Sequence, residues 1–260
     1  MTLTELMIPV MNVALVVGVG VVLPLAFQRP FTAFQVAAVG VAASLSVAPG
    51  WPAALVLAPW LALSAREVVS ALRRKRLVAL FVAGFSLTAA LALVVSRMEW
   101  VLFGIREPIV KLTAIHFTFA GAGTLALAAR AVEARPLPAR RWAGALLMVA
   151  PPFTAVGFLT QLAFFQVGGA VLMTVGVLAV AVFAAQEARV RQRWARALLF
   201  VSAASPWVAM ALAVSWAANQ FWPEVPALTV PDLVPTHGAL NAFGFVLAGH
   251  VAWWLDARGA

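Results

Sequence analysis

Three histidines are the candidate chemical groups of this sequence. Cysteine is absent, so disulfides and thiolate ligands are excluded, and every Asp and Glu lies in a loop or at the end of an apolar run. An imidazole exchanges protons near neutral pH and also ligates metals. His116 lies inside the stretch LTAIHFTFAGAG, and His237 lies in THGALNAFGF. His250 follows near the end of the last apolar run, and we interpret it as interfacial.

His116, His237 and Asn241 are predicted to reach the same depth in a membrane. His116 lies about 13 Å along its apolar segment at 1.5 Å per residue, a little outside the midplane. Asn241 follows His237 by four residues, so both side chains share one helix face. The two segments enter from the same side, which predicts that the three side chains converge as catalytic groups. Alternatively, they serve only as hydrogen bonds between helices.

The absence of carboxylates from the apolar runs excludes several mechanisms. A carboxylate-driven proton antiporter, prenyl transfer by a DDxxD motif and a carboxylate-bridged metal pair all need acidic groups inside the membrane. We therefore expect no metal site, and the sequence names no cofactor.

The amino-acid composition indicates whether this chain folds in water or in a lipid membrane. Of its 260 residues, 64% are hydrophobic and 10% are charged, and the mean hydropathy is +0.99. Soluble domains are about 45–50% apolar and about 25% charged. The sequence therefore predicts an all-α, polytopic transmembrane bundle, a single transmembrane domain over residues 1–260. The N-terminus lacks the basic region of a signal peptide, so we interpret it as a retained first span.

Nine apolar segments approach the roughly 20 residues that a spanning helix needs. They are Leu6–Phe27, Phe31–Ala48, Trp51–Leu72, Leu77–Ser96, Pro108–Ala129, Trp142–Phe165, Gly168–Ala185, Trp194–Phe221 and Leu233–Leu255.

The arginine distribution predicts the orientation. With the N-terminus outside and the C-terminus cytoplasmic, 15 of the 18 basic residues face the cytoplasm, and only Arg97, Arg106 and Lys111 lie outside. This bias follows the positive-inside rule and predicts a multi-pass protein of the cell inner membrane. The net charge of +9 then suits an anionic leaflet, so the bilayer is the expected partner and nucleic acid is not.

Further polar side chains are predicted near the two histidines, in the outer half of the membrane. We expect a pocket that opens outward between the first, fifth, sixth, eighth and ninth segments. Small residues on the face of His116 predict that this histidine faces protein rather than lipid. The candidate substrate-binding residues are Asn12, Lys111, Thr113, Thr118, Gln161 and Asn219. Lys111 has a simpler alternative, since it can extend outward to the interface.

The motifs HFTFAGAG and THGALNAFGF resemble those of the YndJ-like family of bacterial integral membrane proteins. This resemblance implies a polytopic membrane fold and points to His116, His237 and Asn241, but it implies no reaction. The first motif is also similar to the haem-ligand helix of haem-copper oxidases, but Thr118 stands where that pattern has a second histidine, and the function is not carried over.

Four functions remain open. The first is a membrane-embedded enzyme that acts on an isoprenoid or lipid, with His116 as general acid or base, His237 and Asn241 orienting substrate or water, and Lys111 meeting an anionic headgroup. The second is a transporter or binding protein for a small amphipathic solute. The third is a haem protein with His116 and His237 as axial ligands. The fourth is a structural subunit. The sequence determines neither the substrate nor the oligomeric state.

Overall fold

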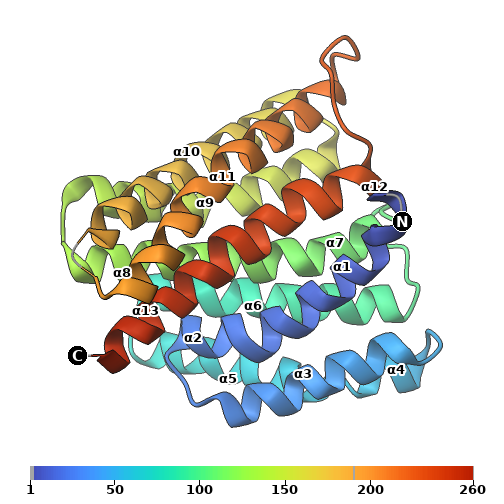
Figure 1. Ribbon diagram of the computed structural model, residues 1–260. Coiled ribbons are helices and arrows are strands. Elements are labelled where there is room, and N and C mark those ends of the chain that lie inside the picture. Colours follow the sequence, from blue (N-terminus) through green and yellow to red (C-terminus); the bar gives the residue numbers. More distant parts are fainter. Residues whose placement is uncertain (1–2, 190, 260) are drawn as a thin grey trace. The chain divides into compact units, whose positions relative to one another are not determined.

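The computed structural model describes residues 3–189 and 191–259, which form helices joined by short connections (Figure 1). Eight helices in these residues are long and apolar enough to cross a membrane. A further apolar helix, α3 (Phe31–Ser46), has 16 residues, or about 24 Å, which is less than the usual hydrocarbon thickness. Its predicted end at Ala48 is two residues too long. The predicted helical, polytopic fold is confirmed, while the orientation of the termini stays a prediction.

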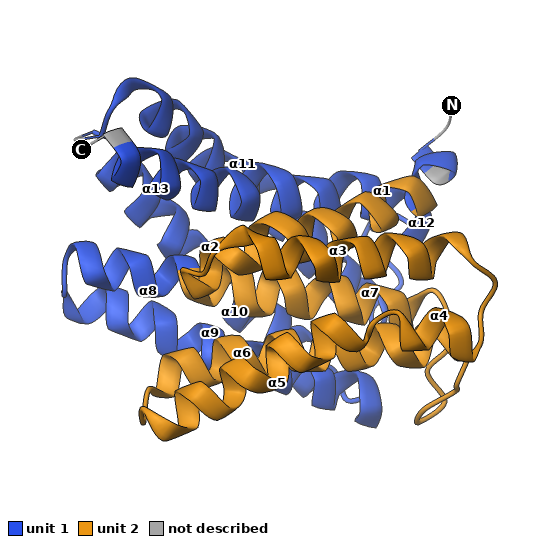
Figure 2. Cartoon of the chain, turned by 90° about the horizontal axis from the view of Figure 1, so that it is seen from below, with its two compact units in different colours: residues 1–7, 127–260 blue, residues 8–126 orange. Residues whose placement is uncertain are grey.

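The chain divides into two compact units (Figure 2). Unit 1 contains residues 1–7 and 127–260, and unit 2 contains residues 8–126. The two units place the sequence motifs differently, since His116 belongs to unit 2 and His237 belongs to unit 1.

Unit 2 contains five successive helical segments, numbered here as passes whether or not they are long enough to span a membrane, and several of them are interrupted. Short π-helical segments, labelled η, interrupt the first and the fifth pass. The elements are α1 (Leu3–Val17), η1 (Gly18–Val22), α2 (Leu23–Phe27), α3, α4 (Trp51–Leu55), α5 (Ala58–Arg73), α6 (Leu77–Arg97), α7 (Ile109–His116), η2 (Phe117–Gly123) and α8 (Thr124–Ala134), which crosses into unit 1. Within unit 2, η1 packs against both α3 and η2, and α6 packs against α5, α7 and η2.

The third pass is broken between α4 and α5. Pro59 lies at the start of α5, where its ring and missing N–H prevent a continuous helix. Helix α3 stabilises the break, because Ser44 donates a hydrogen bond to the carbonyl of Ala53 at 2.6 Å. A side chain on Gly40 would collide with the carbonyl oxygen of Val56, so glycine permits this close approach.

Unit 1 is built around a helical hairpin and the long helix that follows it. Its remaining elements are α9 (Pro138–Thr160), α10 (Ala163–Ala188), α11 (Arg193–Asn219), α12 (Val230–Leu233), η3 (Val234–Gly238), η4 (Leu240–Leu247) and α13 (Ala248–Gly259). Helix α10 packs against α9 and α11, and α11 also packs against η4 and α13. Small side chains allow this spacing, as in the cluster of Ala184, Ala188, Ala195, Leu199, Ala203 and Ala252.

The predicted boundary between the sixth and seventh segments is wrong by several residues. The sequence analysis extended the sixth segment to Phe165, whereas α9 ends at Thr160 and Gln161 adopts a left-handed conformation with φ of 56°. Apolar residues continue from this turn directly into α10. A hydropathy profile along the sequence therefore shows no break at the turn. The side chain of Gln161 instead donates to the carbonyl of Phe158 at 2.6 Å and ends the helix.

Candidate functional site

His116 ends α7, at the point where the fifth pass changes from α-helix to π-helix. Its Nδ1 lies 2.9 Å from the carbonyl oxygen of Leu112. Because a carbonyl only accepts, Nδ1 carries the proton and donates it, and in the neutral ring Nε2 holds the lone pair. His116 is exposed, and it lies in Ile109–Ala134, a helix long and apolar enough to cross a membrane. That it faces protein rather than lipid stays a prediction. The geometry therefore suits proton transfer or ligation at Nε2.

The π-helical segment after His116 changes the helical register. The small residues on the face of His116 were predicted by counting in α-helical turns, whereas η2, which contains Ala120 and Gly123, widens the helix from Phe117 onward. At the start of α8, the hydroxyl of Thr124 donates to the carbonyl of Phe119, five residues earlier, at 3.0 Å. One widened turn rotates all later side chains relative to His116.

The two π-helical segments of unit 2 meet at glycine positions. A Cβ on Gly18 of η1 would lie 2.7 Å from Thr118 Cγ2 and 3.0 Å from Phe119 Cε2. A Cβ on Gly121 of η2 would lie 3.0 Å from the ring of Phe85. The small residues of the first motif therefore pack η2 against its neighbours. π-Helical turns are frequent at functional sites, which fits the position of His116.

His237 is oriented in the same way as His116. It lies in η3, and its Nδ1 is 2.7 Å from the carbonyl oxygen of Ala209 on α11. The same argument assigns the proton to Nδ1 and the lone pair to Nε2. The side chain is half-buried. This carbonyl fixes both the ring orientation and the tautomer of the second predicted histidine.

Asn241 lies beside His237, as their four-residue spacing predicts. Its Nδ2 is 3.3 Å from His237 Nδ1 and 3.6 Å from the sulfur of Met210. Since the proton on His237 Nδ1 points to Ala209, the Asn241 amide donates to the Met210 sulfur instead. Asn241 Oδ1 is buried and has no hydrogen-bond partner among the described residues. This oxygen is therefore available to accept a hydrogen bond from a ligand or a water.

The other predicted site residues make mainly local contacts. Thr113 donates to the carbonyl of Ile109 at 2.9 Å, and the buried Thr118 donates to that of Ala114 at 2.8 Å. Asn219 donates to the carbonyls of Pro223 and Val225, at 3.3 and 2.7 Å. It thereby holds the loop that follows α11. These contacts neither test nor exclude a role in substrate binding.

Two further predicted residues are only half-buried. Lys111 lies in the first turn of α7, and Asn12 lies on α1. The Oδ1 atom of Asn12 is buried without a hydrogen-bond partner among the described residues, like that of Asn241. Unit 2 thus contains Asn12, Lys111, Thr113, His116 and Thr118, and unit 1 contains Gln161, Asn219, His237 and Asn241. Convergence of the two groups, and the outer pocket that would hold them, stay predictions.

Buried ion pairs lie at several helix ends, and the partners of Glu187 were not predicted. In unit 1, Glu187 accepts from Arg135 at 3.1 Å, from Arg140 at 2.9 Å and from Arg191 at 3.3 Å. The Arg140 side chain is 0% exposed, and it also donates to the carbonyl of Ala131 at 2.7 Å. The only sequence signal was an acidic residue among many arginines, which does not identify the partners.

Unit 2 has a similar arrangement around Glu67. Arg29 binds this carboxylate with two hydrogen bonds, at 3.2 and 3.1 Å, and Arg66 adds a third at 3.0 Å. The sequence placed these charges at helix ends, and the structure shows that each carboxylate is buried beneath arginines. Burial of a charge requires such pairing, so these clusters tie helix ends together.

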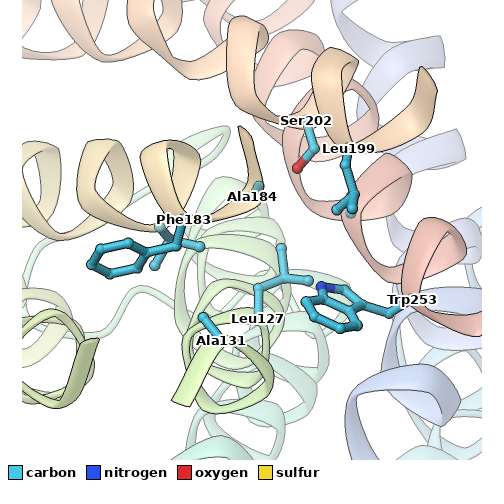
Figure 3. Close-up of a pocket in the computed structure, with 9 residues that line it drawn as sticks. Leu127, Ala131, Phe183, Ala184, Leu199, Ser202 and Trp253 are labelled. Atoms are coloured by element: carbon cyan, nitrogen blue, oxygen red, sulfur yellow. The ribbon is translucent and has the colours of Figure 1, made fainter. Parts of the chain in front are cut away.

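A small cavity lies between α8, α10, α11 and α13 of unit 1 (Figure 3). Leu127, Phe183, Leu199 and Trp253 are among the residues around it, and most of its wall is apolar. Its volume of about 10 Å³ has room for roughly one water molecule. This cavity is too small for a lipid or a cofactor. Among the described residues, no three His, Asp or Glu side chains gather where they could hold a metal ion.

Comparison with known proteins identifies a family. The family model described as YndJ-like protein matches residues 7–245, nearly the whole chain. The matched range includes His116, His237 and Asn241, whereas His250 lies beyond it. Searches among curated proteins and among solved structures found no match. The extent of the family match agrees with the resemblance of the two motifs, and the chain therefore belongs to the YndJ-like protein family.

Proposed function

We propose that this protein is a membrane-embedded enzyme of the cell inner membrane that acts on an isoprenoid or lipid, with His116 as its acid and base. One observation carries the proposal: an exposed imidazole inside a spanning helix, oriented by the carbonyl of Leu112. Ionisable groups within spans are costly and generally functional. In this proposal a lipophilic substrate reaches the imidazole from the bilayer.

The proposed chemistry is proton transfer at Nε2 of His116. This atom accepts a proton from the substrate, or from a water that attacks it, and later returns the proton to the product. Throughout, Nδ1–H stays bonded to the carbonyl of Leu112, which stabilises the imidazolium formed in between. His237 and Asn241 orient the substrate or the water, and Lys111 attracts an anionic headgroup. Asn12, Thr113, Thr118, Gln161 and Asn219 complete the proposed set.

Proteoliposomes in D₂O provide the test. The purified protein is reconstituted with a membrane lipid extract of the expression host, and mass spectrometry follows new lipids and carbon-bound deuterium. We expect the wild-type protein to convert one lipid class. General acid–base catalysis contributes about 10²–10⁴-fold in rate, so His116→Gln lowers the rate by about that factor. Thr160→Val is the control, because Thr160 is exposed on α9 and bonds only its own helix turn.

The same experiment separates the alternatives. A folded His116→Gln variant with the wild-type rate, or a wild-type protein that converts no lipid, contradicts the proposal. Uptake of an amphipathic solute into the liposomes without conversion favours the transporter.

Haem binding by His116 and His237 is a second candidate function. Both rings donate Nδ1–H to a backbone carbonyl, the orientation that metal-ligating histidines commonly show. The absorption spectrum of the protein, purified from haem-supplemented cells, tests this candidate. A Soret band that both His116→Ala and His237→Ala abolish supports haem, whereas a protein without such a band rules it out.

A further inference from the structure

Three arginine–tryptophan stacks gather at the inner end of unit 1. The guanidinium carbon of Arg191 lies 4.6 Å from the ring centre of Trp253, that of Arg193 lies 4.6 Å from Trp194, and that of Arg258 lies 4.1 Å from Trp254. We name these six residues the Arg–Trp edge. All six come from two short segments. The first is residues 191–194, at and just before the start of α11, and the second is residues 253–258, in the second half of α13.

Direct contacts hold the two segments of the Arg–Trp edge together. Arg191 binds Asp256 at 2.6 Å and so joins the approach to α11 to the end of α13. Below this ion pair, Ala195 and Leu199 of α11 pack in one cluster with Ala252 of α13, and Trp253 packs against that cluster. Figure 3 labels Leu199 and Trp253 among the residues around the small cavity. The edge is therefore a preformed surface of the fold.

Two of the three arginine charges of the edge are not balanced by a carboxylate among the described residues. Arg191 is neutralised by Glu187 and Asp256, whereas Arg193 and Arg258 form no ion pair with a carboxylate among the described residues. Arg193 also lies at the positive N-terminal end of the α11 dipole, where a cation is unfavourable, and the first turn of α11 has no acidic residue. An anion at this position would relieve both effects.

The stacked geometry specifies which anion fits. A guanidinium stacked on an indole keeps its N–H groups at its rim, in the plane that binds phosphate in bidentate fashion. Indoles prefer the headgroup level of a bilayer, and Trp194 is 62% exposed. The neighbouring cavity of about 10 Å³ cannot take an acyl chain, so the chains lie along the outer surfaces of the helices.

We propose that the Arg–Trp edge binds the phosphate headgroup of an anionic phospholipid. Arg193 and Arg258 supply the charge-assisted hydrogen bonds, and Trp194 and Trp254 fix the depth of the headgroup. This site is separate from the histidines and does not depend on the proposed enzymatic function.

Native mass spectrometry and thermal unfolding test the site. The full-length protein is reconstituted in nanodiscs of phosphatidylcholine, with or without phosphatidylglycerol. We expect the wild-type protein to retain phosphatidylglycerol after release and to unfold at a higher temperature in its presence. Arg193→Gln with Arg258→Gln should lower lipid retention about tenfold. The control, Arg73→Gln with Arg74→Gln, removes two exposed inner charges of unit 2 that form no ion pair or stack in the described residues, and it should retain the lipid.

Three outcomes would overturn the assignment. Equal loss in both double variants would mean that total positive charge, rather than this edge, attracts the lipid. Equal retention of phosphatidylcholine by the wild-type protein would remove the anionic preference. Stabilisation of the detergent-solubilised protein by millimolar inorganic phosphate, without added lipid, would identify a site for a soluble anion instead. Trp194→Leu removes an indole without changing the net charge. It should weaken the retention of phosphatidylglycerol.

Discussion

Glu187 is the carboxylate on which three arginines of unit 1 converge, and it is nearly fully buried. Arg140, the most buried of the three, also donates to the carbonyl of Ala131 and to Gln186. A buried charge that loses one partner becomes strongly unfavourable, even where the intact pair contributes little. The cluster therefore makes this end of unit 1 sensitive to neutralisation of a single side chain.

Replacement of Glu187 by Gln should lower the free energy of unfolding by about 3 kcal/mol, because Arg140 then stays buried without its carboxylate. Unfolding in detergent micelles, followed by circular dichroism, provides the measurement. Glu133→Gln is the matched control, since Glu133 is exposed at the end of α8, and it should change the free energy by less than about 0.5 kcal/mol. Equal changes in the free energy of unfolding would show that the buried cluster contributes no more to stability than an exposed carboxylate does.

At the scale of elements, glycines determine how closely helices approach. Helices α9 and α10 touch through Gly157 and Gly169, where an added Cβ would collide with the backbone of the partner helix. Lipid supplies no hydrophobic force between helices, so close backbone approach is a main source of association. The α9–α10 hairpin depends on these positions.

Gly169→Ala should destabilise the hairpin, because the new Cβ would lie 2.8 Å from Cα and 2.9 Å from N of Thr154. We expect a loss of about 1–3 kcal/mol, the usual range for overpacking. Gly144→Ala on α9 is the control, since no atom lies within 4 Å of its added Cβ. It should be neutral or slightly stabilising. Thermal unfolding of the two variants compares them, and a neutral Gly169→Ala would contradict the packing argument.

At the scale of the whole molecule, the arginine bias predicts the orientation, and the absence of cysteine makes this easy to test. Phe103→Cys places a thiol at the exposed turn between α6 and α7, and Lys75→Cys places one between α5 and α6. A membrane-impermeant maleimide should label the first variant in intact cells and the second only after permeabilisation. The reverse pattern would place the N-terminus inside.

The predicted convergence of His116 and His237 can be tested in the same cysteine-free chain. The double variant His116→Cys with His237→Cys should form a disulfide on mild oxidation if the two side chains meet as predicted, because a disulfide needs Cα atoms within about 7 Å. Protection of both thiols from a maleimide-linked polymer reports the bond. Each single variant controls for oxidation alone. Full labelling of both thiols after oxidation would contradict direct contact between the two positions.

Hydropathy alone determined the class of this protein and most of its helices. A chain in lipid must satisfy its backbone hydrogen bonds within each segment, so long apolar runs have few structures other than helices. Sequence spacing also predicted the contact of Asn241 with His237, because four residues return to the same face. Motif order indicated the family.

Tertiary structure decided the rest. The register of the side chains after His116 depends on a π-helical segment, which leaves average hydropathy unchanged. The acceptor of His237, the carbonyl of Ala209, lies 28 residues away, and the partners of Glu187 lie up to 52 residues away. Which arginine reaches a carboxylate depends on how helices pack, because Coulomb attraction and hydrogen bonding act over a few ångströms in space and are indifferent to distance along the chain.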